Sequence, residues 1–137
     1  MSNYIYTGVF FDYNELQALV DKITQTRLFR SINNPHVTFA FRPSRINPAL
    51  LGQKAEFEII GYACDGKNQG LQVTMRVSGS TELYQEFRLI ENPHITVSVS
   101  EDGKPVDTGK MTFIRTLEPL TITGRYGGFV DGKVVFE

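Results

Sequence analysis

The sequence is short of cysteine and of long apolar runs, and each shortage excludes a class of protein. Cys64 is the only cysteine among 137 residues, which excludes a disulfide scaffold and predicts a small buried residue in a reducing, cytoplasmic protein. No apolar run approaches about 18 residues, so we expect no membrane span and no membrane partner. The first residues show no basic segment followed by an apolar one, so we expect no signal peptide.

An excess of charge of one sign is also missing. The chain has 14 Lys and Arg against 15 Asp and Glu, for a net charge of −1. A protein that binds a long nucleic acid through its phosphates usually has a basic excess. We therefore expect any phosphate-bearing partner to be small, or to be recognised in one local pocket.

Aromatic residues, by contrast, are plentiful, with 10 Phe and 6 Tyr, and this excludes a disordered chain. The length predicts one domain over residues 1–137. Asp12, followed by Glu15, resembles a helix N-cap, and apolar spacing predicts a helix from about 13 to 27, with Arg30 near its end. Residues 81–90 fit a helix or a strand. Alternating or β-branched residues predict strands over 4–11, 36–42, 55–65, 71–78, 95–100, 120–126 and 130–136.

These elements predict an α+β domain built on antiparallel sheet, with one secure helix. The pair Gly127-Gly128 lies between the last two predicted strands, and we interpret it as a turn or bulge. No phosphate-binding glycine motif is present.

An internal repeat is the most specific signal in the chain. The pentapeptide Asn-Pro-His-Val-Thr at 34–38 recurs as Asn-Pro-His-Ile-Thr at 92–96, 58 residues later. The only two histidines, His36 and His94, both lie in it. The repeat indicates two related halves with one copy in each.

Each copy opens a predicted strand, and the spacing determines which side chains share a face. Residues i and i+2 of a strand point the same way, so His36 lies beside Thr38, and His94 beside Thr96. If the halves pack by a pseudo-twofold axis, two imidazoles and two hydroxyls surround one small group.

This set suits a phosphodiester. Hydrolysis needs one group to take a proton from water and another to protonate the leaving oxygen, and histidine does both near neutral pH. Two hydroxyls can donate to the non-bridging oxygens. A structural role for the histidines and a metal site are the alternatives, although the H-x-T spacing brings no second ligand to the same face.

The sequences His36-Val37-Thr38-Phe39 and His94-Ile95-Thr96-Val97 resemble the repeated motif of the two-histidine (2H) phosphoesterase superfamily. The resemblance covers essentially the whole chain. Segments 103–110 and 124–129 are similar to its RNA-repair branch, the cyclic phosphodiesterase parts of tRNA ligases.

The resemblance implies a bilobal α+β fold with two pseudo-symmetric antiparallel sheet lobes around a central cleft. It implies hydrolysis of a 2′,3′-cyclic phosphate, or a related cyclic or 2′,5′ phosphodiester, of a nucleotide or RNA end, with no metal and no cofactor. His36 and His94 would be general base and acid, in an order left open, and Thr38 and Thr96 would bind the phosphate. No stable protein partner is implied, and we expect a monomer.

Three further residues are candidates for substrate binding. Continued alternation from His36 would place Arg42 on the same face, where it could reach a second phosphate or a base. Tyr126 and Phe129 could stack on a nucleobase. A binding module that holds a nucleotide or RNA end without turnover, and a metal-dependent hydrolase, both stay open as alternatives to the enzyme.

Overall fold

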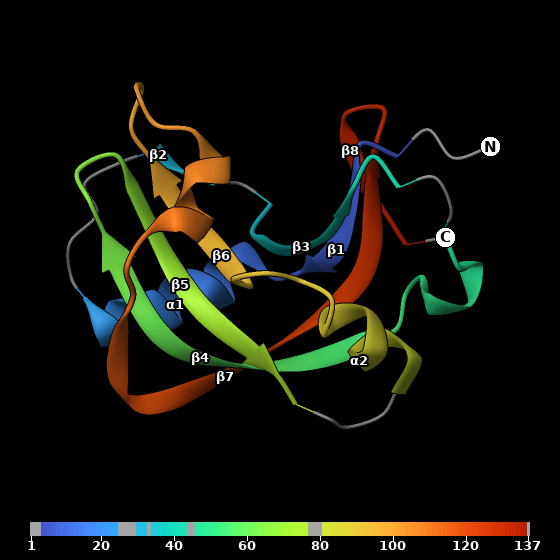
Figure 1. The fold of residues 1–137 in the computed structure, drawn as a ribbon, viewed down its shortest axis with the longest axis horizontal. Helices are drawn as coiled ribbons and strands as arrows, with labels where there is room; N and C mark the ends of the chain where they lie inside the picture. Colours follow the sequence, from blue (N-terminus) through green and yellow to red (C-terminus); the bar gives the residue numbers. More distant parts are fainter. Residues whose placement is uncertain (1–3, 25–29, 33, 44–45, 77–80, 137) are drawn as a thin grey trace.

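The computed structural model describes residues 4–24, 30–32, 34–43, 46–76 and 81–136. Within these ranges the chain forms the α+β antiparallel fold predicted from its sequence pattern (Figure 1). The helices are α1 (Tyr13–Ile23) and α2 (Thr81–Phe87), and two short 3-10 turns are η1 (Pro48–Leu50) and η2 (Pro105–Lys110). The strands are β1 (Tyr6–Phe10), β2 (Arg30–Ser31), β3 (His36–Phe41), β4 (Lys54–Cys64), β5 (Asn68–Met75), β6 (His94–Val99), β7 (Ile114–Val130) and β8 (Lys133–Val135).

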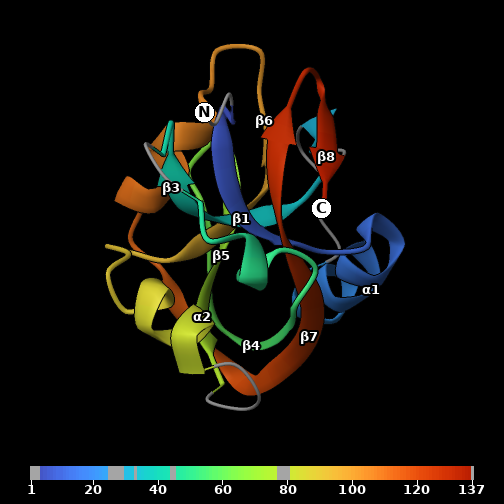
Figure 2. The same ribbon diagram turned by 90° about the vertical axis from the view of Figure 1, so that its right-hand side faces the viewer.

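All the strands join one sheet in the order β2-β6-β5-β4-β7-β1-β3, with β8 paired to β7. The sheet curls into a nearly closed, barrel-like form, seen from the side in Figure 2. Its ends meet where β3 contacts β6, and the two-residue strand β2 pairs with only Ser98 and Val99 of β6. The first part of β6 therefore lies beside β3 across a seam in the sheet.

One hydrophobic core joins the sheet and both helices. Leu16 and Val20 of α1 and Leu83 of α2 are completely buried, and they belong to the same cluster as Val9, Val37, Phe57, Ile59, Leu71 and Ile95 of the strands. Burial of such side chains contributes roughly 1.5–3 kcal/mol each. None of the described helices is long and apolar enough to cross a membrane.

Helix α1 starts as predicted and ends early. The Asp12 carboxylate accepts a hydrogen bond of 2.9 Å from the Glu15 backbone N–H, which confirms the N-cap. Thr24 is already extended (φ −152°), so the helix ends at Ile23; residues 25–27 of the predicted helix lie outside the described residues. Arg30, predicted near the helix end, lies instead on β2.

The ambiguous segment 81–90 begins with helix α2, so the described residues contain two helices rather than one. The predicted interruption at Gly127-Gly128 is wrong, because β7 continues to Val130. The turn lies at Asp131 and Gly132, whose positive φ angles of 53° and 76° suit a two-residue hairpin. A side chain on Gly128 would collide with the Tyr4 ring, which is why glycine is needed inside this strand. Cys64, predicted to be buried, is exposed at the end of β4.

Candidate active site

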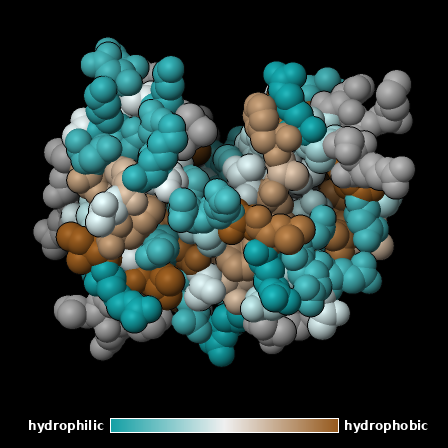
Figure 3. Space-filling view, in the orientation of Figure 1, coloured by the Kyte–Doolittle hydropathy of each residue, from teal (hydrophilic) through white to brown (hydrophobic). Residues whose placement is uncertain are grey.

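The repeated motifs begin two strands that lie side by side. His36 is the first residue of β3 and His94 the first of β6, and these strands contact one another across the seam. Figure 1 shows both strands in the middle of the molecule, and the space-filling surface in the same orientation is notched there (Figure 3). Val37 and Ile95 are fully buried, so the residues on either side of them point away from the core.

The two threonines have matching partners across the sheet. Thr38 lies opposite Gly8 of β1, and Thr96 lies opposite Gly70 of β5. In both pairs the register shifts by one residue just before the glycine. The residue after each threonine, Phe39 or Val97, therefore has no partner on the neighbouring strand and forms a β-bulge. Bulges of this kind re-aim side chains next to functional sites. The repeat seen in the sequence is therefore also a repeat of backbone geometry.

Neither glycine can be replaced without displacing its surroundings. A Cβ on Gly8 would collide with the backbone carbonyl of Val37, and one on Gly70 would collide with the methyl group of Thr108. Because Gly8 has no side chain, β1 can lie close to β3 beside Thr38. Because Gly70 has none, the turn η2 can place Thr108 close to Thr96.

Both imidazoles are held in the same way. Nδ1 of His36 lies 2.8 Å from the carbonyl oxygen of Asn34, and Nδ1 of His94 lies 2.8 Å from that of Asn92. A carbonyl oxygen only accepts, so each Nδ1 carries a proton and donates it. In the neutral rings Nε2 is then the atom that can accept a proton, and it is the atom left for chemistry.

His36 is enclosed by aromatic rings. Its ring stacks on Tyr6 with centroids 4.6 Å apart, and the Phe10 ring lies 5.2 Å away. Burial lowers the pKa of His36, and repulsion from His94 lowers it further, against an opposing effect of the Asn34 carbonyl. This repulsion agrees with the contact between β3 and β6, the two strands that the histidines begin.

His94 is packed against the turn η2. A Cβ on Gly109 would lie 2.9 Å from Cε1 of His94, so only a glycine lets the turn approach the ring so closely. One residue earlier, Thr108 places its hydroxyl 3.0 Å from that of Thr96. The turn therefore contacts both members of the second motif.

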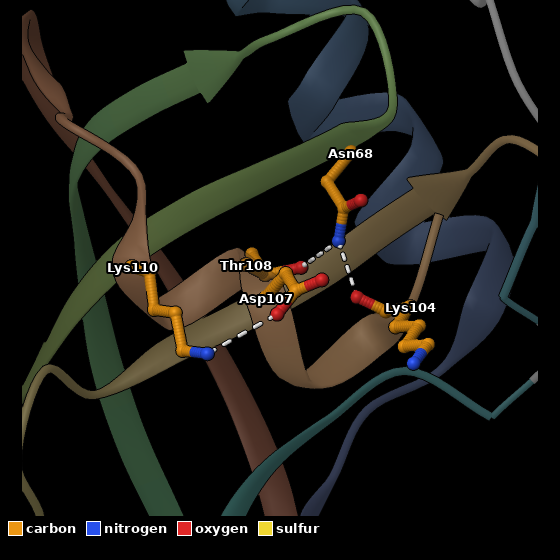
Figure 4. A network of polar contacts seen from close by, with 5 residues as sticks. All are labelled: Asn68, Lys104, Asp107, Thr108 and Lys110. Carbon is orange, nitrogen blue, oxygen red and sulfur yellow. Dashed lines mark hydrogen bonds and ion pairs between the residues drawn. The ribbon is translucent and has the colours of Figure 1, made fainter. Parts of the chain in front are cut away.

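A buried polar network fixes η2 in place (Figure 4). The Asn68 side-chain amide donates to the Thr108 hydroxyl (2.9 Å) and to the Lys104 carbonyl (2.7 Å). Asn68 is 1% exposed and Thr108 0% exposed, so these bonds are shielded from water. The Thr108 oxygen accepts from the Asn68 amide and also from the Thr96 hydroxyl, so the network reaches the second motif.

No known protein family matches the chain, and no curated protein matches it. Within the described ranges there is also no cluster of three or more His, Cys, Asp or Glu side chains arranged to hold a metal ion.

Two of the three further candidate residues lie elsewhere than predicted. Arg42 is not on the His36 face, because β3 ends at Phe41 and Arg42 turns away with a φ of 48°. Its guanidinium lies 5.5 Å from the centre of the Phe41 ring. Tyr126 is 3% exposed and belongs to the core, packed edge-on against Phe39, so it offers no face to a nucleobase.

Phe129 does lie near the first motif. Its ring stacks on Tyr6 at 5.2 Å and 9°, and Tyr6 in turn stacks on His36. The three rings form a column that ends at the imidazole. Tyr6 was missed in the sequence, as were Asn68, Thr108 and Gly109, although segment 103–110 carried part of the family resemblance.

Proposed function

We propose that the protein is a phosphodiesterase that opens a 2′,3′-cyclic phosphate, or a related cyclic or 2′,5′ phosphodiester, of a nucleotide or RNA end, with His36 and His94 as general base and acid. The observation that supports this most is the matched presentation of the two imidazoles. Both start strands that meet at the seam, both donate Nδ1–H to the carbonyl two residues earlier, and both stand beside a threonine opposite a glycine. Nothing in the proposed reaction requires a metal or a cofactor.

The surroundings of the histidines favour one assignment of their roles. Burial and repulsion from His94 lower the pKa of His36, which favours its neutral form and therefore the role of general base. Its Nε2 takes a proton from the attacking water as the new P–O bond forms. His94 then gives a proton to the ribose oxygen as the old P–O bond breaks, so one proton is taken up and one is released. His36 then loses its proton to solvent and His94 takes one up, which restores the starting state.

The threonines supply donors for the phosphate oxygens. Thr38 and Thr96 stand next to the histidines on the face away from the core. Thr108 accepts from the Asn68 amide and from the Thr96 hydroxyl at 3.0 Å, so the network holds the Thr96 oxygen in place next to His94. A hydroxyl held in place in advance can turn its proton to a phosphate oxygen without moving its own oxygen, which limits reorganisation during the reaction.

The strand order supports the finer fold assignment, a bilobal 2H-like arrangement. Taken on either side of the β4–β7 pair, the sheet has the halves β2-β6-β5-β4 and β7-β1-β3. The histidine strand β3 is the outermost strand of one half, and the histidine strand β6 is followed in the other only by the two-residue β2, so β3 and β6 meet at the seam. A central cleft between two related lobes accounts for this order.

The test is turnover of 2′,3′-cyclic mononucleotides and of short RNA with a cyclic end, with and without a chelator, by wild type, His36→Gln and His94→Gln. We expect turnover that survives the chelator and falls at least about a thousandfold in each variant, since each removes an acid–base group. Arg76→Gln, an exposed position directly after β5, is the control and should keep full activity.

Two results would contradict the proposal. Tight binding of a cyclic nucleotide without product would instead identify a binding module. Loss of turnover on chelation would identify a metal-dependent hydrolase.

A further inference from the structure

Four residues line up across four adjacent strands, beginning at the first histidine. His36 of β3 is paired with Phe10 of β1, Phe10 with Arg125 of β7, and Arg125 with Lys54 of β4. Residues directly opposite each other share a face of the sheet. Arg125 and Lys54, the two cations of this row, therefore lie on the same face as the His36 imidazole. We call the four aligned residues the cationic row.

The far end of the cationic row opens into a cavity of about 450 Å³. Its lining includes Phe10, Lys54, Arg125 and Phe136, together with Asp12 and Asn34. Asn34 is the residue whose carbonyl holds His36, so the cavity adjoins the first motif. The Arg125 guanidinium lies over the Phe136 ring at 4.4 Å, which orients the cation within the cavity.

The placement of the two cations lowers the stability of the fold. Lys54 and Arg125 are directly opposite each other across β4 and β7, a placement that costs free energy when both charges are alike. No ion pair of either side chain is found among the described residues. The cavity lining also holds one acid, Asp12, whose carboxylate already accepts the Glu15 N–H at the start of α1. Two facing cations in an aromatic-lined cavity suit a phosphate with a neighbouring base.

We propose that Lys54 and Arg125 bind an internal phosphate of an RNA strand whose cyclic end lies between the histidines. The inference rests on the proposed function and names its substrate class, an oligonucleotide rather than a mononucleotide. With strands about 4.8 Å apart, the backbones of Arg125 and Lys54 lie about 10 and 14 Å from that of His36. Only a substrate with further nucleotides reaches that far, and a single pair of cations needs no basic excess in the whole protein.

The test compares kcat/KM for an RNA tetranucleotide with a 2′,3′-cyclic end and for the corresponding cyclic mononucleotide. We expect wild type to favour the tetranucleotide by at least about tenfold, with a preference that falls as salt is raised. The double variant Lys54→Met/Arg125→Met should reduce the ratio of the two kcat/KM values to about one. Lys22→Met, which removes an exposed cation from the last turn of α1, is the control and should keep the wild-type ratio. A wild-type ratio near one, or a high ratio that survives in the double variant, would overturn the inference.

A binding measurement separates this inference from the proposed function. Titration with a 3′-phosphorylated tetranucleotide needs no turnover, so it can be read even if no substrate is hydrolysed. We expect the double variant to bind more weakly. The slope of its log K against log[salt] should be smaller in magnitude by about one to two. Equal affinity and equal salt dependence in wild type and double variant would contradict the inference whether or not the protein is an enzyme. Both side chains are exposed, so the variant should fold, and thermal unfolding checks this.

Discussion

The imidazole of His36 stacks on the phenol ring of Tyr6 with an interplanar angle of 19°. The contact fixes the ring plane, while the bond to Asn34 fixes its rotation, so Nε2 points in one direction. We expect Tyr6→Leu to lower kcat about tenfold, because a loosened base spends less time in a productive geometry. Tyr6→Phe keeps the ring and should retain most of kcat. Equal losses in both variants would mean that the hydroxyl matters rather than the stack.

The rate should depend on pH as expected for a neutral base and a protonated acid. The pKa of His36 is lowered by burial and by His94, so the acidic limb of kcat/KM should lie below the usual histidine value of about 6.5. Activity is lost as the pH falls through that limb, because His36 becomes protonated. The two imidazoles interact, so the limbs report the pair. A profile that is flat from about pH 5 to 8 would contradict paired acid–base catalysis.

The free energy of unfolding should also decrease as the pH is lowered. The folded state resists protonation of His36, while the unfolded chain takes up the proton near pH 6.5, so acidification favours unfolding below that value. Above it the effect is absent. We expect wild type to lose more unfolding free energy than His36→Gln between about pH 7 and 5, by at most about 1.4 kcal/mol per pH unit. Denaturant unfolding of both proteins at several pH values measures the difference, and parallel curves would contradict the shift.

Gly8→Ala should destabilise the fold, because its Cβ collides with backbone rather than with a flexible side chain. We expect a loss of about 1–3 kcal/mol, together with reduced activity as β3 is pushed away. Gly66→Ala is the comparison. Gly66 has a φ of 88° and nothing within 4 Å of its Cβ position, so the loss there is limited to about 1 kcal/mol of backbone strain. Thermal and denaturant melts rank the two, and the reverse order would contradict the close approach.

Thr108→Val tests the network behind the second motif. The variant keeps the shape but leaves the buried Asn68 amide with one partner fewer, at a cost of about 1–3 kcal/mol. It also removes the hydroxyl next to Thr96, so we expect kcat to fall about tenfold with KM changed less. Thr108→Ser retains the hydroxyl and should keep kcat near wild type. A serine variant as slow as the valine variant would show that the methyl group is what matters.

The parts of the site that follow from local spacing could be predicted from the sequence, and those that depend on distant segments could not. The pairing of His36 with Thr38 needs only strand alternation. Arg42 was misplaced because alternation was carried through an extra residue, Phe39, and past the end of the strand. The Asn68–Thr108 bond joins residues 40 apart in the sequence, and no local pattern announces it.

Burial was harder to predict than strand formation. Tyr126 was expected to reach a substrate, but the curl of the sheet turns it into the core beside Phe39. Gly127-Gly128 was interpreted as a break, because the approach of the Tyr4 ring, which needs glycine there, cannot be seen in the sequence. Both errors concern the way the sheet closes on itself, whereas most of the strands were recognised from composition and period. The two-residue strand β2 and the first residues of β7 were not predicted.

The mirrored glycine–threonine pairs divide the candidate site between two parts of the chain. Each part carries one imidazole, one hydroxyl and the bulge beside them, so neither part holds a complete acid–base pair. The proposed chemistry is therefore available only once the sheet has closed and brought β3 against β6. A change that opens the seam between these strands should abolish turnover even though each motif stays locally intact.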